Sequence, residues 1–177
     1  MSKLHTGGSD LDARLLHTLI DLPHRILQSH DSDELSPIVL HDLGHDHHFG
    51  LNKAVYLVDN PDFDCLRGVA GFCRDECKFH KADVWEKPHE FAQDMASAEF
   101  HQLMKKFSDN SISRQNHQHT PESLALLGQK LGIKNPSCCV WNMKHGNHGI
   151  LIFEEHDQRL ARQKDLINKV TALLSLC

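Results

Sequence analysis

A regular spacing of apolar residues predicts helices near both ends of the chain. Apolar residues recur every three or four positions over residues 11–27, which predicts a helix that Pro23 bends or interrupts. The same spacing predicts a second helix over residues 35–43, ending at Gly44, and a last helix from about Gln158 to the C-terminus.

Between these helices the apolar period changes from helical to extended. AVYLVD (54–59) and CLRGVAGF (65–72) are short runs rich in β-branched and aromatic residues, and the turn sequence NPDFD joins them into a predicted antiparallel hairpin. SCCVWNMK (137–144) and GILIFEE (149–155) predict a second hairpin. AVYLV and GILIF are apolar on both faces, so we expect both sides of the sheet to be covered.

The segment between the two hairpins has mixed signals. Residues 89–107 have helical spacing, and a further helix is predicted to start with Thr120 as N-cap and Pro121 as its first residue. Weaker strands are predicted over residues 77–85 and 111–115. The pattern predicts an α+β fold, with a central antiparallel sheet of about five to six strands and helices on both faces.

Composition indicates one globular domain. A chain of 177 residues is long enough to bury a core without disulfides, and we expect residues 11–177 to form a single domain after a disordered segment at residues 1–10. The net charge of −5, with scattered Lys and Arg, does not favour nucleic acid or an anionic membrane as a partner.

Location follows from the same features. The polar start MSKLHTGGSD has no signal-peptide pattern, and the longest apolar runs, GILIF and TALLSL, are too short to span a bilayer. We therefore expect a cytoplasmic protein whose six cysteines are reduced.

Several local sequences resemble the GAF family of small sensory and regulatory domains. The resemblance lies in the order of DELSPIVLHDL, LNKAVYLVDN, LRGVAGF, ESLALLGQKLGI, SCCVWNMK and HGILIFEE, and it covers roughly Leu11 to Leu176. LHDLGHDHHFGLNKAVYLV is especially similar to the GAF-like segment that follows the HDOD domain in some bacterial signalling proteins.

The resemblance implies regulation rather than catalysis. It suggests a sensory domain that binds a small ligand or a protein partner, and that forms a homodimer through its terminal helices. GAF domains bind very different molecules, so the cofactor, if any, stays open.

Four residues are candidates for a ligand pocket between the sheet and residues 72–107. Arg67, Phe79, Trp85 and Trp141 could line it, with Arg67 facing an anionic group. The alternative is that Trp141 belongs to the core and Arg67 is an ordinary surface residue.

The cysteines suggest a second hypothesis, a metal- or haem-binding redox sensor. Cys73, Cys77 and His80 combine thiols and an imidazole, which suit zinc, although a fourth ligand would have to come from elsewhere. The alternative is a loop with one exposed and one buried thiol. Cys138 and Cys139 are adjacent on a predicted strand, so their side chains should point to opposite faces.

The sequence HDLGHDHH suggests a third hypothesis. His41 and Asp42 resemble the metal-binding pair of HD-type phosphohydrolases, but those domains are helical throughout, whereas this chain turns to strands at Ala54. The simpler interpretation is a helix C-terminus, where imidazole groups interact favourably with exposed carbonyl groups.

Overall fold

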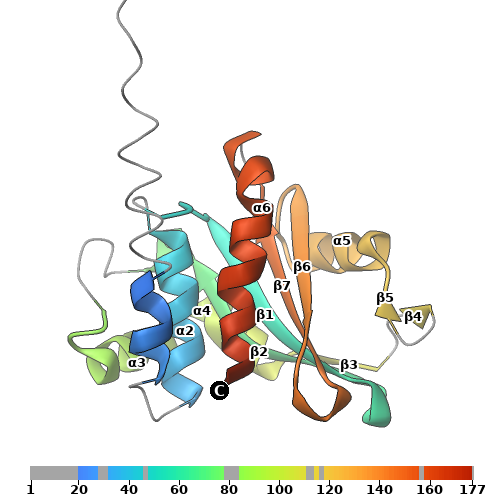
Figure 1. Ribbon diagram of the computed structural model, residues 1–177, viewed down its shortest axis with the longest axis horizontal. Helices are drawn as coiled ribbons and strands as arrows, with labels where there is room; N and C mark the ends of the chain where they lie inside the picture. The colour runs from blue at the N-terminus through green and yellow to red at the C-terminus, as the bar shows by residue number, and fades with distance from the viewer. Residues whose placement is uncertain are drawn as a thin grey trace, which may run out of the picture.

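The centre of the molecule is one antiparallel sheet. The computed structural model describes residues 20–27, 32–45, 48–77, 84–110, 114–115, 118–155 and 158–176. Its five-stranded sheet has the strand order β3-β2-β1-β7-β6, and helices lie on both sides of it (Figure 1). The predicted α+β class is therefore confirmed.

Two hairpins supply four of the five strands, as predicted. The strands are β1 (Lys53–Asn60), β2 (Cys65–Cys73), β3 (Ser108–Asp109), β6 (Pro136–Asn142) and β7 (His148–Glu154). Short 3₁₀ turns, η1 (Pro61–Phe63) and η3 (Lys144–Gly146), close the β1–β2 and β6–β7 hairpins. A separate two-stranded ribbon consists of β4 (Arg114–Gln115) and β5 (Gln118–His119).

The helices follow the predicted order, and the structure adds a break at Ala98 that was not predicted. Residues 20–27 are helical, and the other helical elements are α2 (Ser32–Gly44), η2 (Arg74–Glu76), α3 (Pro88–Ser97), α4 (Glu99–Lys106), α5 (Pro121–Lys130), α6 (Gln158–Thr171) and η4 (Ala172–Leu176). The helical spacing predicted over residues 89–107 corresponds to two helices, because Ala98 is extended (φ −69°, ψ 127°) and separates α3 from α4. This break lets α4 turn onto β2.

The weaker predicted strands are only partly present. Arg74–Glu76 is a 3₁₀ turn and residues 84–87 form turns and bends, so the described ends of the 77–85 region are not strand. Residues 78–83 lie outside the described part of the chain, as do residues 111–113 and the predicted disordered segment 1–10. Residues 114–115 do form a short strand, β4.

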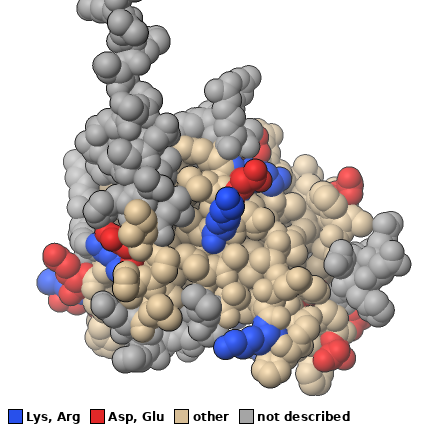
Figure 2. Space-filling view, viewed as in Figure 1, with Lys and Arg blue, Asp and Glu red and all other residues tan. Residues whose placement is uncertain are grey.

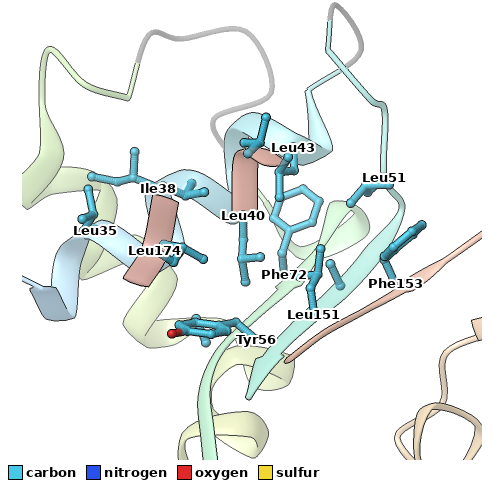
Figure 3. Close-up of a cluster of buried hydrophobic side chains, with 14 of the residues drawn as sticks. Leu35, Ile38, Leu40, Leu43, Leu51, Tyr56, Phe72, Leu151, Phe153 and Leu174 are labelled. Atoms are coloured by element: carbon cyan, nitrogen blue, oxygen red, sulfur yellow. The ribbon is translucent and has the colours of Figure 1, made fainter. Parts of the chain in front are cut away.

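One face of the sheet is covered by the helices from both ends of the chain. Side chains from residues 20–27, α2, α3, α6 and η4 meet the sheet here and form what we call the α2/α6 core. Figure 3 shows part of it, with side chains of α2 and Leu174 beside those of the strands. Its members include Leu22, Ile26, Leu35, Ile38, Leu40, Leu43, Tyr56, Phe72, Phe91, Trp141, Leu151, Phe153, Ile167, Val170 and Leu174.

The other face is covered by α4 and α5. Its α4/α5 core contains Val55, Leu57, Leu66, Phe100, Met104, Leu124, Leu127, Ile133, Ile150 and Ile152. Strands β1 and β7 contribute alternate residues to the two cores, which explains why their sequences are apolar throughout. No helix in the described part of the chain is long and apolar enough to cross a membrane.

Candidate functional site

The candidate site is an open groove near the start of β2, which we call the Arg67 groove. Its volume is about 350 Å³, at the small end of the range for ligand sites. The lining residues are Val58, Asn60, Cys65, Arg67, Gly68, Val69 and Lys105.

A β-bulge shapes the apolar wall of this groove. Tyr56 pairs with Ala70 while Leu57 pairs with Gly68, so Val69 is an extra residue in β2 with no partner on β1. Val58 and Val69 both pack against the edge of the α2/α6 core. Bulges re-aim side chains where they occur, and here the bulge adds a second valine beside Val58.

Gly68 brings α4 close enough to contribute a second cation. A Cβ atom at Gly68 would lie 1.9 Å from the Met104 carbonyl oxygen, so only glycine permits this approach. The Gly68 amide also donates a hydrogen bond to the Phe107 carbonyl (3.0 Å). Lys105 follows Met104 on α4, which covers the α4/α5 side of the sheet. The close approach at Gly68 lets Lys105 reach the groove, although the other side chains that line it lie on the α2/α6 side.

The polar groups of the groove are mainly donors. Arg67 and Lys105 can only donate, and no carboxylate is among the lining residues. The Asn60 side-chain oxygen already accepts from the Asp62 and Phe63 amides (3.1 and 3.3 Å), so its NH₂ group holds the remaining hydrogen-bonding capacity. Arg67 is exposed, and it makes no hydrogen bond or ion pair within the described residues.

Trp141, another predicted pocket residue, lies in the same cross-strand row as Arg67. Arg67 pairs with Val58, Val58 with Gly149 and Gly149 with Trp141, so the four residues cross the sheet on one face. The indole lies over Gly149, where an added Cβ atom would be 2.2 Å from the ring. Trp141 is 7% exposed and stacks on Tyr56 with ring centroids 5.6 Å apart, so it is mainly a core residue.

Trp85 is not part of this site. Its indole N–H donates to Asp42 Oδ2 at 2.7 Å, and the Arg25 guanidinium lies 5.8 Å from its ring centroid. This contact belongs to the end of α2, near the far end of β2, where Arg74 donates to the Gly44 carbonyl. Phe79 lies outside the described residues.

The HDLGH segment is the C-terminal end of α2. His48 Nδ1 is 2.7 Å from the Asp42 carbonyl oxygen, and His41 is buried with its ring 5.0 Å from that of Phe91. With the Trp85 indole bonded to the Asp42 carboxylate, these contacts support the helix-end interpretation. The antiparallel sheet also differs from the helical frame that the HD-type hypothesis requires.

The candidate metal ligands point into different cores. Cys73 packs against the α4/α5 core, whereas Cys77 is buried in the α2/α6 core. His80 lies outside the described residues, and no group of three or more His, Cys, Asp or Glu within the described ones could hold a metal ion.

Burial also makes several thiols poor ligands. It raises the pKa values of Cys73 and Cys138, and it raises the pKa of Cys139 to about 12. Cys138 and Cys139 face opposite cores, as predicted. Because thiolates rather than thiols bind metals and react with oxidants, these side chains are suited to packing.

One polar contact was missed by sequence reasoning. Asp59 is completely buried on the α4/α5 side of β1, and its Oδ2 lies 3.1 Å from Nε2 of His119, whose side chain is 2% exposed. His119 immediately precedes Thr120, which caps α5 by accepting from the Ser123 amide. The Asp59–His119 pair therefore ties the start of α5 to the sheet. A polar residue at the end of an apolar strand was the only available signal.

Comparisons with known proteins give no further identification. No protein family, curated protein or solved structure matches this chain.

Proposed function

We propose that this chain is a GAF-like regulatory domain of the cytoplasm, which binds a small ligand and passes on its state through a dimer contact rather than by turning over a substrate. Its support is the order of elements: two helical segments, a hairpin, helices, a second hairpin and a closing helix. This is the order that the sequence resemblance implies.

The observation that carries the proposal is the Arg67 groove. It is open, it is lined mainly by hydrogen-bond donors and two valines, and its exposed guanidinium has no partner within the described residues. These groups are suited to hold and orient a ligand. The described charges on the face that carries α6 form small separate groups rather than a basic band (Figure 2), which fits a small molecule better than nucleic acid.

The terminal helices offer the dimer contact. Leu22 and Ile26 of the first helical segment are buried in the α2/α6 core, together with Ile167, Val170 and Leu174 from α6 and η4. On the same segment Ile20 and Leu27 are 63% and 65% exposed. A second copy packing on this segment would cover both side chains.

Light scattering after size exclusion tests this contact. We expect the wild type to be a dimer and the variant Ile20→Ser/Leu27→Ser to be a folded monomer. Leu103→Ser/Leu126→Ser is the matched control, because these leucines are 57% and 60% exposed on α4 and α5, and it should stay dimeric. A monomeric wild type would overturn the dimer part of the proposal.

A further inference from the structure

We propose that the Arg67 groove binds a small organic anion, with its carboxylate or phosphate head on Arg67 and Lys105 and its apolar body on Val58 and Val69. The proposal rests on the regulatory function above and names the ligand class for its site. The side chains that define it come from β1, β2 and α4.

The head-group assignment follows from the donor set. An arginine fork binds carboxylate or phosphate through two parallel hydrogen bonds, and a nearby ammonium adds charge. Asn60 adds NH₂ donors, since its side-chain oxygen is used in the turn. A neutral ligand rich in acceptors would leave the Arg67 guanidinium without a counter-charge within the described residues, whereas an anion supplies one.

The size and apolar body follow from the walls. About 350 Å³ accommodates a small molecule, not a nucleotide with its full set of phosphates. Val58 and Val69 are partly buried, so a ligand covering them removes further apolar surface from water. The next position in the Arg67–Val58–Gly149 row is Trp141, whose buried indole N–H has no partner within the described residues. Both ends of this row, Arg67 and Trp141, therefore carry N–H donors that have no acceptor within the described residues.

Cys65 provides a built-in probe of charge in the groove. It lines the groove two residues before Arg67, and its Sγ lies 3.5 Å from Ser108 Oγ. Iodoacetate and iodoacetamide react with a thiol in the same way: the sulfur attacks the methylene carbon, a C–S bond forms, iodide leaves and the thiol proton goes to solvent. They differ in charge, so the ratio of their rates at Cys65 reports the local preference for an anion.

The first experiment measures that ratio by peptide mass spectrometry of the full chain. We expect Arg67→Gln to lower the iodoacetate-to-iodoacetamide rate ratio at Cys65 roughly threefold or more, and Lys105→Gln to lower it as well. Lys130→Gln, an exposed lysine at the end of α5, should leave it unchanged. An unchanged ratio in both groove variants would overturn the proposal.

The second experiment measures equilibrium binding by amide chemical shifts, with benzoate and phenyl phosphate as anions and benzamide as the neutral counterpart. We expect benzoate, phenyl phosphate or both to shift the amide resonances of Val58, Arg67 and Val69. Arg67→Gln should weaken that binding about tenfold or more. Benzamide binding as tightly as the anions, or an unchanged affinity in Arg67→Gln, would refute the anion assignment.

Failure of this inference can be told apart from failure of the proposed function. The dimer measurement above is repeated on Arg67→Gln, whose exposed side chain contributes little to folding. A dimer that shows no preference for anions would refute the ligand class alone. A monomer that nevertheless binds benzoate through Arg67 would refute the dimer contact and leave the ligand class standing.

Discussion

The two faces of strand β1 differ sharply near its C-terminal end. Asp59 points into the α4/α5 side, where it is completely buried and paired with His119. Its neighbours Val58 and Asn60 face the Arg67 groove, where the guanidinium is exposed and has no partner within the described residues. On one face the Asp59 carboxyl group already has a partner, and on the other face the Arg67 guanidinium has none within the described residues.

The comparison separates charges that hold the fold from charges that can bind. A buried carboxylate without a partner is strongly unfavourable, so the Asp59–His119 pair fixes where the start of α5 sits. An exposed cation without a partner costs the folded state little free energy, because water solvates it. Mutations at the two positions should therefore act on different quantities.

The largest effect is expected from breaking the buried pair. Asp59→Ala should lower the free energy of unfolding by about 3–5 kcal/mol, because it leaves His119 buried beside an apolar site. Urea unfolding measures this, with the exposed Asp62→Ala as control. A double-mutant cycle with His119→Ala should show that the two losses are not additive. A loss below about 1 kcal/mol would contradict this role.

Gly68 should have the next largest effect, because it links the groove to α4. Gly68→Ala forces a methyl group against the Met104 carbonyl, and we expect a loss of about 2–3 kcal/mol. Gly146→Ala is the matched control: no atom lies within 4 Å of its added Cβ, and only its positive φ (+71°) is unfavourable, at about 1 kcal/mol. Equal losses in the two variants would show that the close approach is not required.

A smaller, pH-dependent effect is expected at His101, which anchors α4 to β2. Burial is the main cause that lowers its pKa, a hydrogen bond with Gly71 acts in the opposite direction, and the charge of Lys105 lowers the pKa by a smaller amount. His101 therefore binds a proton more readily in the unfolded chain than in the folded one. The free energy of unfolding should consequently fall as the pH drops below about 6.5. Unfolding at several pH values should show a shallower dependence in His101→Gln than in the wild type. The exposed His145→Asn should retain the wild-type dependence.

The smallest effect on stability is expected at Arg67 itself. Arg67→Gln should change the free energy of unfolding by no more than about 0.5 kcal/mol, while the preference of the groove for anions is lost. Urea unfolding of the same samples used for binding checks this. A large loss of stability would instead place Arg67 among the residues that hold the fold.

Much of the fold could be predicted because its determinants are local. Thr120 caps α5 and Pro121 follows it, as the sequence indicated, and α2 ends at Gly44. The apolar runs paired into the two predicted hairpins. In each case the information lies within a few neighbouring residues.

The errors and omissions concern contacts between distant segments. The break at Ala98 has no proline or glycine to mark it, and the approach of α4 to Gly68 favours it instead. The partner of Asp59 lies far along the chain, in a hairpin of two-residue strands. For the site, Arg67 was identified and lines a groove, whereas Lys105 and the bulge at Val69 were not foreseen.

The bulged residue Val69 has a consequence for how this protein can evolve. All residues of β2 except Val69 have a partner on β1. Deletion of Val69 would therefore leave a regular antiparallel ladder without the bulge, and it would remove one of the two valines that form the apolar wall of the groove. A lineage could thus lose or regain its binding specificity by a three-nucleotide deletion or insertion, while the sheet, both cores and the buried pair are inherited intact.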